Sequence, residues 1–182
     1  MSSDAVDGFL RQWARERPDL DVFPMGVIGR LHRAYRLVSG EVQNYFHSVG
    51  MESWEFDVLA TLRRSGPPYT LSPKDLVATT MVGSPALTNR VDHLVRQELV
   101  TREVDPNNRR RLLITLTEKG LELVDRVVEG HLANERRLLV ALDAEECHEL
   151  NTLLRKLLVS LGDAGTVSES AAPSRRLPSE VE

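Results

Sequence analysis

Hydrophobic and polar residues alternate with a helical period along most of the chain. Residues 5–17 predict a short helix that ends before Pro18. Residues 24–49 predict a long helix, because proline is tolerated in a first turn and Gly50 ends the run. Its apolar residues recur every three or four positions, at Val27, Leu31, Ala34, Val38, Val42 and Phe46. Such a stripe needs a partner surface along the whole helix.

Three shorter helices are predicted next, over residues 54–65, 73–80 and 84–97. The Gly-Pro-Pro run at 66–68 and Gly83 separate them. A serine stands at the start of each helix and is the expected N-cap, since its hydroxyl can accept a hydrogen bond from the first turn. These serines are Ser53, Ser72 and Ser84. The last two helices predict a helix-turn-helix.

Beyond residue 98 the pattern changes from helical to alternating. Residues 99–104 and 112–116 predict two strands. Between them, Asp-Pro-Asn-Asn-Arg-Arg-Arg at 105–111 is rich in turn formers and arginine. The prediction is a β-hairpin with a basic tip.

Two amphipathic helices complete the pattern. The first covers residues 118–142 with Thr117 as its N-cap, and the second begins after Asp143. The second carries a run of leucines, at Leu150, Leu153, Leu154, Leu157 and Leu161. From Gly162 onward the composition is dominated by small, polar and charged residues, which predicts a disordered tail.

This order of elements predicts a winged helix-turn-helix, mainly α with a small β-hairpin wing and long N- and C-terminal dimerisation helices. Residues 53–117 are predicted to form the DNA-binding lobe, and residues 24–52 with 118–162 the helical dimerisation region. Residues 1–23 add an extra helix and linker, and residues 163–182 form the tail.

The distribution of charge supports one contact face. The formal net charge of the chain is -4. Between Ser84 and Arg111, however, six arginines outnumber four acids, so that this segment carries +2 and the remainder -6. A basic segment on an acidic body is expected of a protein that touches DNA with one face.

Two further features concern the compartment. The chain has no long uncharged apolar run and does not begin like a signal peptide, so we expect no membrane association and a cytoplasmic location. Its one cysteine, Cys147, excludes an internal disulfide and fits a reducing compartment.

The chemistry of DNA recognition assigns roles to residues in the segment from Ser84 to Arg111. Side chains near the start of a recognition helix reach base edges in the major groove, and wing guanidiniums bind phosphates or the minor groove. The helix residues expected to contact DNA are Ser84, Pro85, Ala86, Thr88, Asn89, Arg90 and His93. The wing residues are Arg109, Arg110 and Arg111.

The stretch TNRVDHLVRQELVTREVDPNNRRRLLITLTEKG, residues 88–120, resembles the core signature of the MarR family of bacterial transcription regulators. The resemblance extends in layout over residues 24–161. It implies a homodimer on double-stranded DNA, and a two-fold dimer reads an inverted repeat with half-sites about one helical turn apart. The chain departs from the pattern at Asn108, where the family usually has an aspartate that organises the wing arginines.

A subgroup of that family, the PecS and urate-responsive regulators, is also similar in four positions. Its members carry a tryptophan in an extra N-terminal helix, an aspartate with an arginine seven residues on, and an arginine in the recognition helix. The corresponding residues here are Trp13, Asp57, Arg64 and Arg90. The resemblance implies a pocket for a planar anionic ligand such as urate, whose binding releases the DNA.

Alternatives to this ligand site stay open. Trp13 can fix the first helix to the core, and Asp57 and Arg90 can form a structural ion pair. A second alternative is that the chain resembles a related regulator and takes a tricarboxylate such as aconitate or citrate at these positions. The third alternative is a regulator that has no small ligand and is controlled by oxidation of Cys147.

Other chemistry is not indicated. Neither Cys147-His148 nor the His131/Glu135 pair forms a cluster with metal spacing, so surface positions are expected for them. The sequence contains no phosphate loop, nucleophile elbow or catalytic triad signature. We therefore expect no metal, no cofactor and no enzymatic activity.

Overall fold

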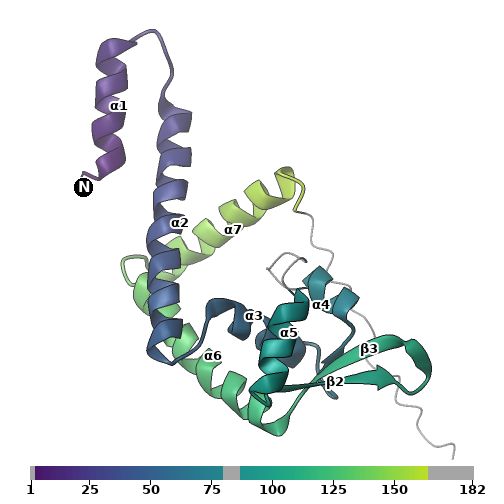
Figure 1. The fold of residues 1–182 in the computed structure, drawn as a ribbon. Coiled ribbons are helices and arrows are strands. Elements are labelled where there is room, and N and C mark those ends of the chain that lie inside the picture. Colours follow the sequence, from purple (N-terminus) through teal and green to yellow (C-terminus); the bar gives the residue numbers. More distant parts are fainter. Residues whose placement is uncertain (1–2, 80–86, 164–182) are drawn as a thin grey trace, which may run out of the picture. The chain divides into compact units, whose positions relative to one another are not determined.

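A computed structural model describes residues 3–79 and 87–163 of the chain. The expected N-cap Ser84 and all but the first residue of the predicted tail lie outside these ranges. The chain divides into two compact units, residues 1–138 and 139–182. Each is described by itself (Figure 1).

The first unit opens with two helices that lie side by side, α1 (Ala5–Glu16) and α2 (Phe23–Ser48) (Figure 1). The predicted short and long helices are thus confirmed. Close packing at Gly26 and Gly29, against the side chains of Leu10 and Val6, brings the helices together. Arg30 of α2 joins the start of α1, with its Nε 2.8 Å from an Asp4 carboxylate oxygen.

Three helices follow: α3 (Ser53–Arg64), α4 (Pro73–Thr79) and α5, described over Leu87–Arg96. Ser72 caps α4 as predicted, because its Oγ accepts the Asp75 N–H at 3.2 Å. The predicted cap of α3 is wrong by one residue. Ser53 is already helical, and the N-cap is Glu52, whose N–H donates to Glu55 Oε2 at 2.7 Å.

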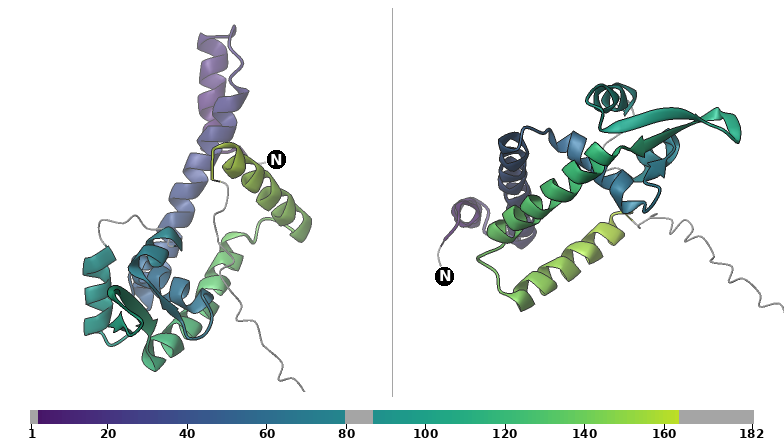
Figure 2. Two further views of the ribbon diagram at one scale, coloured as in Figure 1. Left: turned by 90° about the vertical axis from the view of Figure 1, so that its right-hand side faces the viewer. Right: turned by 90° about the horizontal axis from the view of Figure 1, so that it is seen from below.

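The hairpin belongs to a three-stranded antiparallel sheet in the order β1-β3-β2. Its strands are β1 (Thr70–Leu71), β2 (Val100–Asp105) and β3 (Asn108–Leu116). The two-residue β1 was not predicted. β3 also begins earlier than predicted, since pairing extends to Asp105 opposite Asn108. The hairpin projects beyond the helices of its unit (Figure 2).

The core of this unit lies between α3, α4, α5 and the sheet, and helix α6 (Glu118–Leu138) covers it. Its most deeply buried side chains are Val58, Leu59, Leu62, Leu76, Leu94, Val100, Ile114 and Val124. Thr117 caps α6 as predicted, accepting the Gly120 N–H at 3.0 Å. The helix ends at Leu138, four residues before the predicted end.

Gly120 allows α6 to approach the backbone just before β2 closely. A Cβ at this position would overlap the backbone carbonyl oxygen of Leu99, which already accepts the Thr117 N–H at 3.1 Å. We expect Gly120→Ala to lower the free energy of unfolding by about 2–3 kcal/mol, since backbone cannot move aside cheaply. Gly8→Ala, on an open helix face, is the matched control. Chemical denaturation checks both, and a Gly120 variant as stable as the wild type would contradict the packing.

The second unit consists of helix α7 (Ala144–Ser160) and the turn before it. Asp143 caps the helix as predicted, accepting the Glu146 N–H at 2.9 Å. None of its residues is buried, and apolar side chains including Leu150, Leu153 and Leu161 are exposed. Within the described ranges, no helix combines the length and apolarity needed to cross a membrane.

Candidate nucleic-acid interface and ligand site

Helix α5 presents three different faces. Leu87, Val91 and Leu94 are buried and anchor it in the core. Thr88 and Asn89 are exposed, which is compatible with their predicted contact with bases. Ser84, Pro85 and Ala86 lie outside the described residues. Arg96 was not predicted as a contact, although its spacing of seven from Asn89 on a helix puts both on one exposed face.

The third face of α5 turns toward α3 rather than outward. The Arg90 guanidinium lies over the Trp54 ring, 5.3 Å from its centroid. The His93 Nε2 lies 3.0 Å from a carboxylate oxygen of Glu55. Both residues were predicted to touch DNA, and the described contacts instead place both of them against α3.

The wing arginines lie on a strand and not in the turn. Arg109, Arg110 and Arg111 form the start of β3, so the turn is shorter than predicted, while the arginines stay at the turn end of the hairpin. The turn itself is closed by side chains. Asp105 Oδ1 accepts the Asn107 N–H at 2.8 Å, and Asn108 Oδ1 accepts the Arg110 N–H at 3.1 Å.

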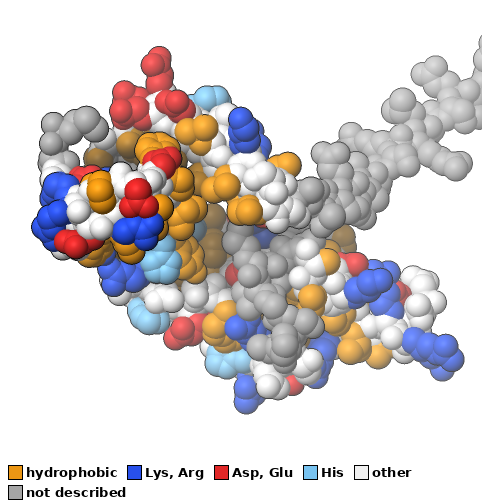
Figure 3. All heavy atoms as spheres, turned by 90° about the horizontal axis from the view of Figure 1, so that it is seen from above, with side chains coloured by type: hydrophobic (Ala, Val, Ile, Leu, Met, Phe, Trp, Pro, Cys, Tyr) orange, Lys and Arg blue, Asp and Glu red, His pale blue; other side chains and the backbone are white. Residues whose placement is uncertain are grey.

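The three wing arginines differ in their partners. Arg111 Nη2 lies 3.2 Å from the Asp75 carboxylate on α4. The Ser72 hydroxyl, and then Arg111, hold the pKa of Asp75 below its usual value, so this pair is charged at neutral pH. Within residues 3–79 and 87–163, the exposed side chains of Arg109 and Arg110 have no acidic partner. Lys and Arg side chains (blue) stand at the outer end of the hairpin in Figure 3.

The predicted ligand residues of α3 share a face with a residue that was missed. Asp57 and Arg64 are two turns apart, and Trp54 lies one turn before Asp57 on the same side of the helix. Arg64 Nη2 donates to Thr61 Oγ1, which lies on this face too, at 2.9 Å. Since Arg90 stacks on Trp54, the structure gathers an aromatic ring, a carboxylate and two guanidiniums around α3. The spacing of three residues between Trp54 and Asp57, which places both on one helix face, is the sequence signal that could have identified Trp54.

Trp13 lies elsewhere in the chain. It lines a groove of about 400 Å³ between α1 and α2, together with Phe9, Met25, Ile28 and other residues of the two helices. The described contacts within one chain do not bring it to Arg64 or Arg90. Its predicted role at the ligand therefore stays a prediction.

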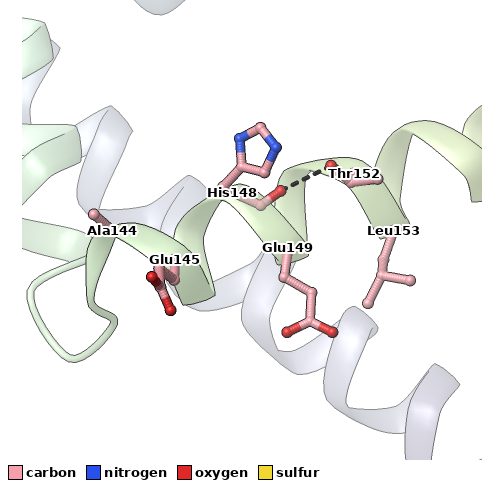
Figure 4. Close-up of a pocket in the computed structure, with 6 residues that line it drawn as sticks. All are labelled: Ala144, Glu145, His148, Glu149, Thr152 and Leu153. Atoms are coloured by element: carbon pink, nitrogen blue, oxygen red, sulfur yellow. Dashed lines mark hydrogen bonds between the residues drawn. The ribbon is translucent and has the colours of Figure 1, made fainter.

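A larger hollow of about 610 Å³ runs along α7, and its six lining residues all belong to that helix (Figure 4). None of the four predicted ligand residues lines it. Cys147 is half-buried at the start of the same helix, with its Sγ 3.9 Å from the Leu142 carbonyl oxygen. In the described part of the chain no three His, Cys, Asp or Glu side chains form a group that could hold a metal ion.

His131 differs from the surface position that was expected. Its side chain is only 15% exposed, and its ring packs against the rings of Tyr45, Phe46 and Phe56. It pairs with Glu135 across one helical turn at 3.2 Å. The residue thus contributes to packing between α2, α3 and α6.

Comparison with known proteins decides the family. The profile of the MarR family matches residues 49–111, from the end of α2 to the wing arginines. The transcriptional regulator PecS of Dickeya dadantii is 41% identical over 152 residues, which is 84% of this chain and 92% of PecS. The chain belongs to the MarR family. It is a transcriptional regulator and not an enzyme, because its relatives and its fold are those of regulators.

Solved structures of MarR regulators agree with this fold. BpsR of Bordetella bronchiseptica, whose DNA binding is regulated by 6-hydroxynicotinic acid, superposes with a TM-score of 0.65 at 27% identity, covering 76% of this chain and 94% of BpsR. Sco3205 of Streptomyces coelicolor, solved in complex with DNA, gives a TM-score of 0.70 at 22% identity, covering 81% of this chain and 91% of Sco3205. The winged helix-turn-helix prediction is thereby confirmed. Repression and dimerisation are typical of this family.

Proposed function

We propose that the chain is a PecS-like repressor that binds an inverted repeat in double-stranded DNA as a homodimer and is released by a small anionic ligand. The exposed residues Thr88, Asn89 and Arg96 of α5 read base edges. The exposed guanidiniums of Arg109 and Arg110, which have no acidic partner among the described residues, bind the backbone or the minor groove beside them. Such a protein works in the cytoplasm, where the bacterial chromosome lies.

Two exposed apolar surfaces support the homodimer. On α2, the stripe residues Val27, Leu31 and Val38 are exposed although they are spaced as a packed helix face. On α7, the leucine stripe is left uncovered within its own unit. A second copy that covers both surfaces follows the two-fold arrangement that reads an inverted repeat.

The ligand we propose is a planar anion, urate or a related purine. The observation that carries it is the position of Arg90, a recognition-helix residue stacked on the α3 face that holds Asp57 and Arg64. An arginine offers a planar fork to an anionic oxygen, a carboxylate accepts a ring N–H, and an aromatic ring covers a flat ligand. An anion that moves Arg90 away from Trp54 shifts the position of α5 against α3. This shift lowers the affinity of the protein for DNA.

The 41% identity with PecS supports the placement in this subgroup, and BpsR shows that a planar heteroaromatic acid regulates DNA binding in a relative of similar fold. Within one chain Trp13 lines the groove between α1 and α2. It contacts the ligand only if another subunit of the assembly brings the two together. The tricarboxylates aconitate and citrate offer charge without a flat ring, and they are the comparison class for the test.

A thermal melt of the purified dimer against urate, xanthine, 6-hydroxynicotinate, aconitate and citrate tests the ligand class. A bound ligand at a hundred times its Kd stabilises the folded state by about 2.7 kcal/mol through mass action. We expect urate or xanthine to raise the melting temperature and the tricarboxylates to leave it unchanged. Melting temperatures that no planar anion shifts would refute the ligand assignment.

A further inference from the structure

Two pairs of side chains connect α3 with the recognition helix, and they are adjacent on both helices. Trp54 and Glu55 are neighbours on α3, whereas Arg90 and His93 lie one turn apart on α5. The ring of Trp54 contacts both partners, since the His93 ring meets it edge-on with centroids 5.5 Å apart. These four residues, which we name the α3–α5 clamp, fix α5 at two points along its axis.

The carboxylate of Glu55 is the most constrained part of the clamp. Its side chain is 7% exposed, and Oε2 is held by the Glu52 N–H at 2.7 Å. Oε1 then faces the His93 Nε2 at 3.0 Å, and the side-chain nitrogen of Gln97, four residues further on, lies 2.8 Å from the same ring atom. A buried carboxylate is tolerated only where hydrogen bonds satisfy it, so losing the His93 partner exposes Glu55 to a desolvation penalty. The arrangement therefore favours one position of His93, and with it one rotation of α5.

We propose that Glu55 is a positioning residue for DNA recognition, which acts through His93 to set the orientation of α5 in the major groove. The proposal rests on the proposed DNA binding but not on any ligand. It gives His93 a role inside the protein, in place of the base contact that the sequence predicts. Because Asp57 and Arg64 lie on the same helix as Glu55, the clamp also links the candidate ligand face to the recognition helix.

Orientation and direct contact have different signatures in binding experiments. An error in the orientation of α5 weakens contacts to base edges, which only the specific sequence offers, and leaves phosphate contacts to any duplex largely intact. When two residues act through one interaction, the effects of their substitutions on the binding free energy do not add. The effects of substitutions at independent residues do add.

The experiment is a double-mutant cycle with Glu55→Ala and His93→Ala. Dissociation constants are measured on a duplex that the wild-type protein selects from a random library, and on a shuffled duplex. We expect each single variant to weaken specific binding about tenfold, and the double variant no more than about twofold further. Binding to the shuffled duplex should stay within about twofold.

Conservative variants and a matched control complete the design. Glu55→Gln and His93→Gln can still form a hydrogen bond across the clamp, so both should bind the selected duplex within about threefold of wild type. Glu122→Ala, an exposed glutamate on α6, should have no effect. If Glu55→Ala does not fold, the contrast between His93→Ala and His93→Gln decides.

Three results would overturn the proposal. Additive losses of about a hundredfold in the double variant would make His93 a direct DNA contact. Equal losses on both duplexes would reduce Glu55 to a general structural role. Unchanged affinities in both single variants would show that the clamp does not position α5. A wild-type protein that selects no duplex would instead refute the proposed function itself.

Discussion

Replacing Arg109 and Arg110 together with alanine is expected to weaken DNA binding at least about a hundredfold at low salt, on specific and shuffled duplexes alike. The reason is that both guanidiniums are exposed on β3 and lack an acidic partner in the described part of the chain, so they are available to phosphates. A dimer loses four such groups. Since each neutralised phosphate contributes about 0.9 to the salt slope, the plot of log K against log salt should become shallower by about three to four units.

The matched control is Arg15→Ala with Arg17→Ala, which removes the same charge from exposed arginines in and just beyond α1. It should change affinity by no more than about threefold, because neither arginine lies on α5 or the wing. Arg111→Ala gives a further contrast, since Arg111 is already paired with Asp75. An unchanged salt slope in the Arg109/Arg110 double variant would rule out the wing as a phosphate-binding element.

The second large effect is expected at the candidate ligand face. Arg64→Gln should raise the urate concentration needed to release half of the DNA by about tenfold or more, because a charge-assisted, bidentate hydrogen bond to an anion contributes about 1.5–3 kcal/mol. Affinity for DNA without ligand should stay within about threefold, since Arg64 is exposed at the end of α3 and lies outside the clamp. A competition assay on the selected duplex measures both quantities.

Arg15→Gln is the matched control for this variant, because it makes the same change on an exposed arginine of α1. A urate response that Arg64→Gln leaves intact, or that Arg15→Gln weakens equally, would remove Arg64 from the ligand site. Asp57→Asn tests the carboxylate in the same assay, with a loss of urate response expected if it accepts a ring N–H.

Most of the fold was predictable because periodicity is a local signal. The helices and the hairpin follow from spacings within ten to twenty residues, and the caps at Ser72, Thr117 and Asp143 follow from single residues beside an apolar run. The two-residue strand β1 carries no period of its own, because only its pairing with β3 defines it. Likewise, the sequence predicts a turn at the wing arginines. The Asp105–Asn108 pairing that makes them part of a strand depends on contacts across the hairpin, which the local pattern does not show.

The candidate site was predictable only where it lies on one element. Asp57 and Arg64 share a face of α3 by spacing alone. The pairs that join elements, Arg90 with Trp54 and Arg111 with Asp75, connect residues 36 positions apart and depend on how helices and strands pack. Periodicity identifies which face of α5 is buried, but the tertiary packing decides which neighbour its polar face meets.

The most direct test of a ligand-released repressor is one titration. The wild-type dimer is bound to its selected inverted-repeat duplex, and urate is added while the bound fraction is followed by gel shift, with xanthine and aconitate in parallel. We expect release by urate or xanthine below millimolar concentration, and we expect Arg64→Gln to stay bound under the same conditions. A complex that remains intact with all three compounds up to millimolar levels would contradict it.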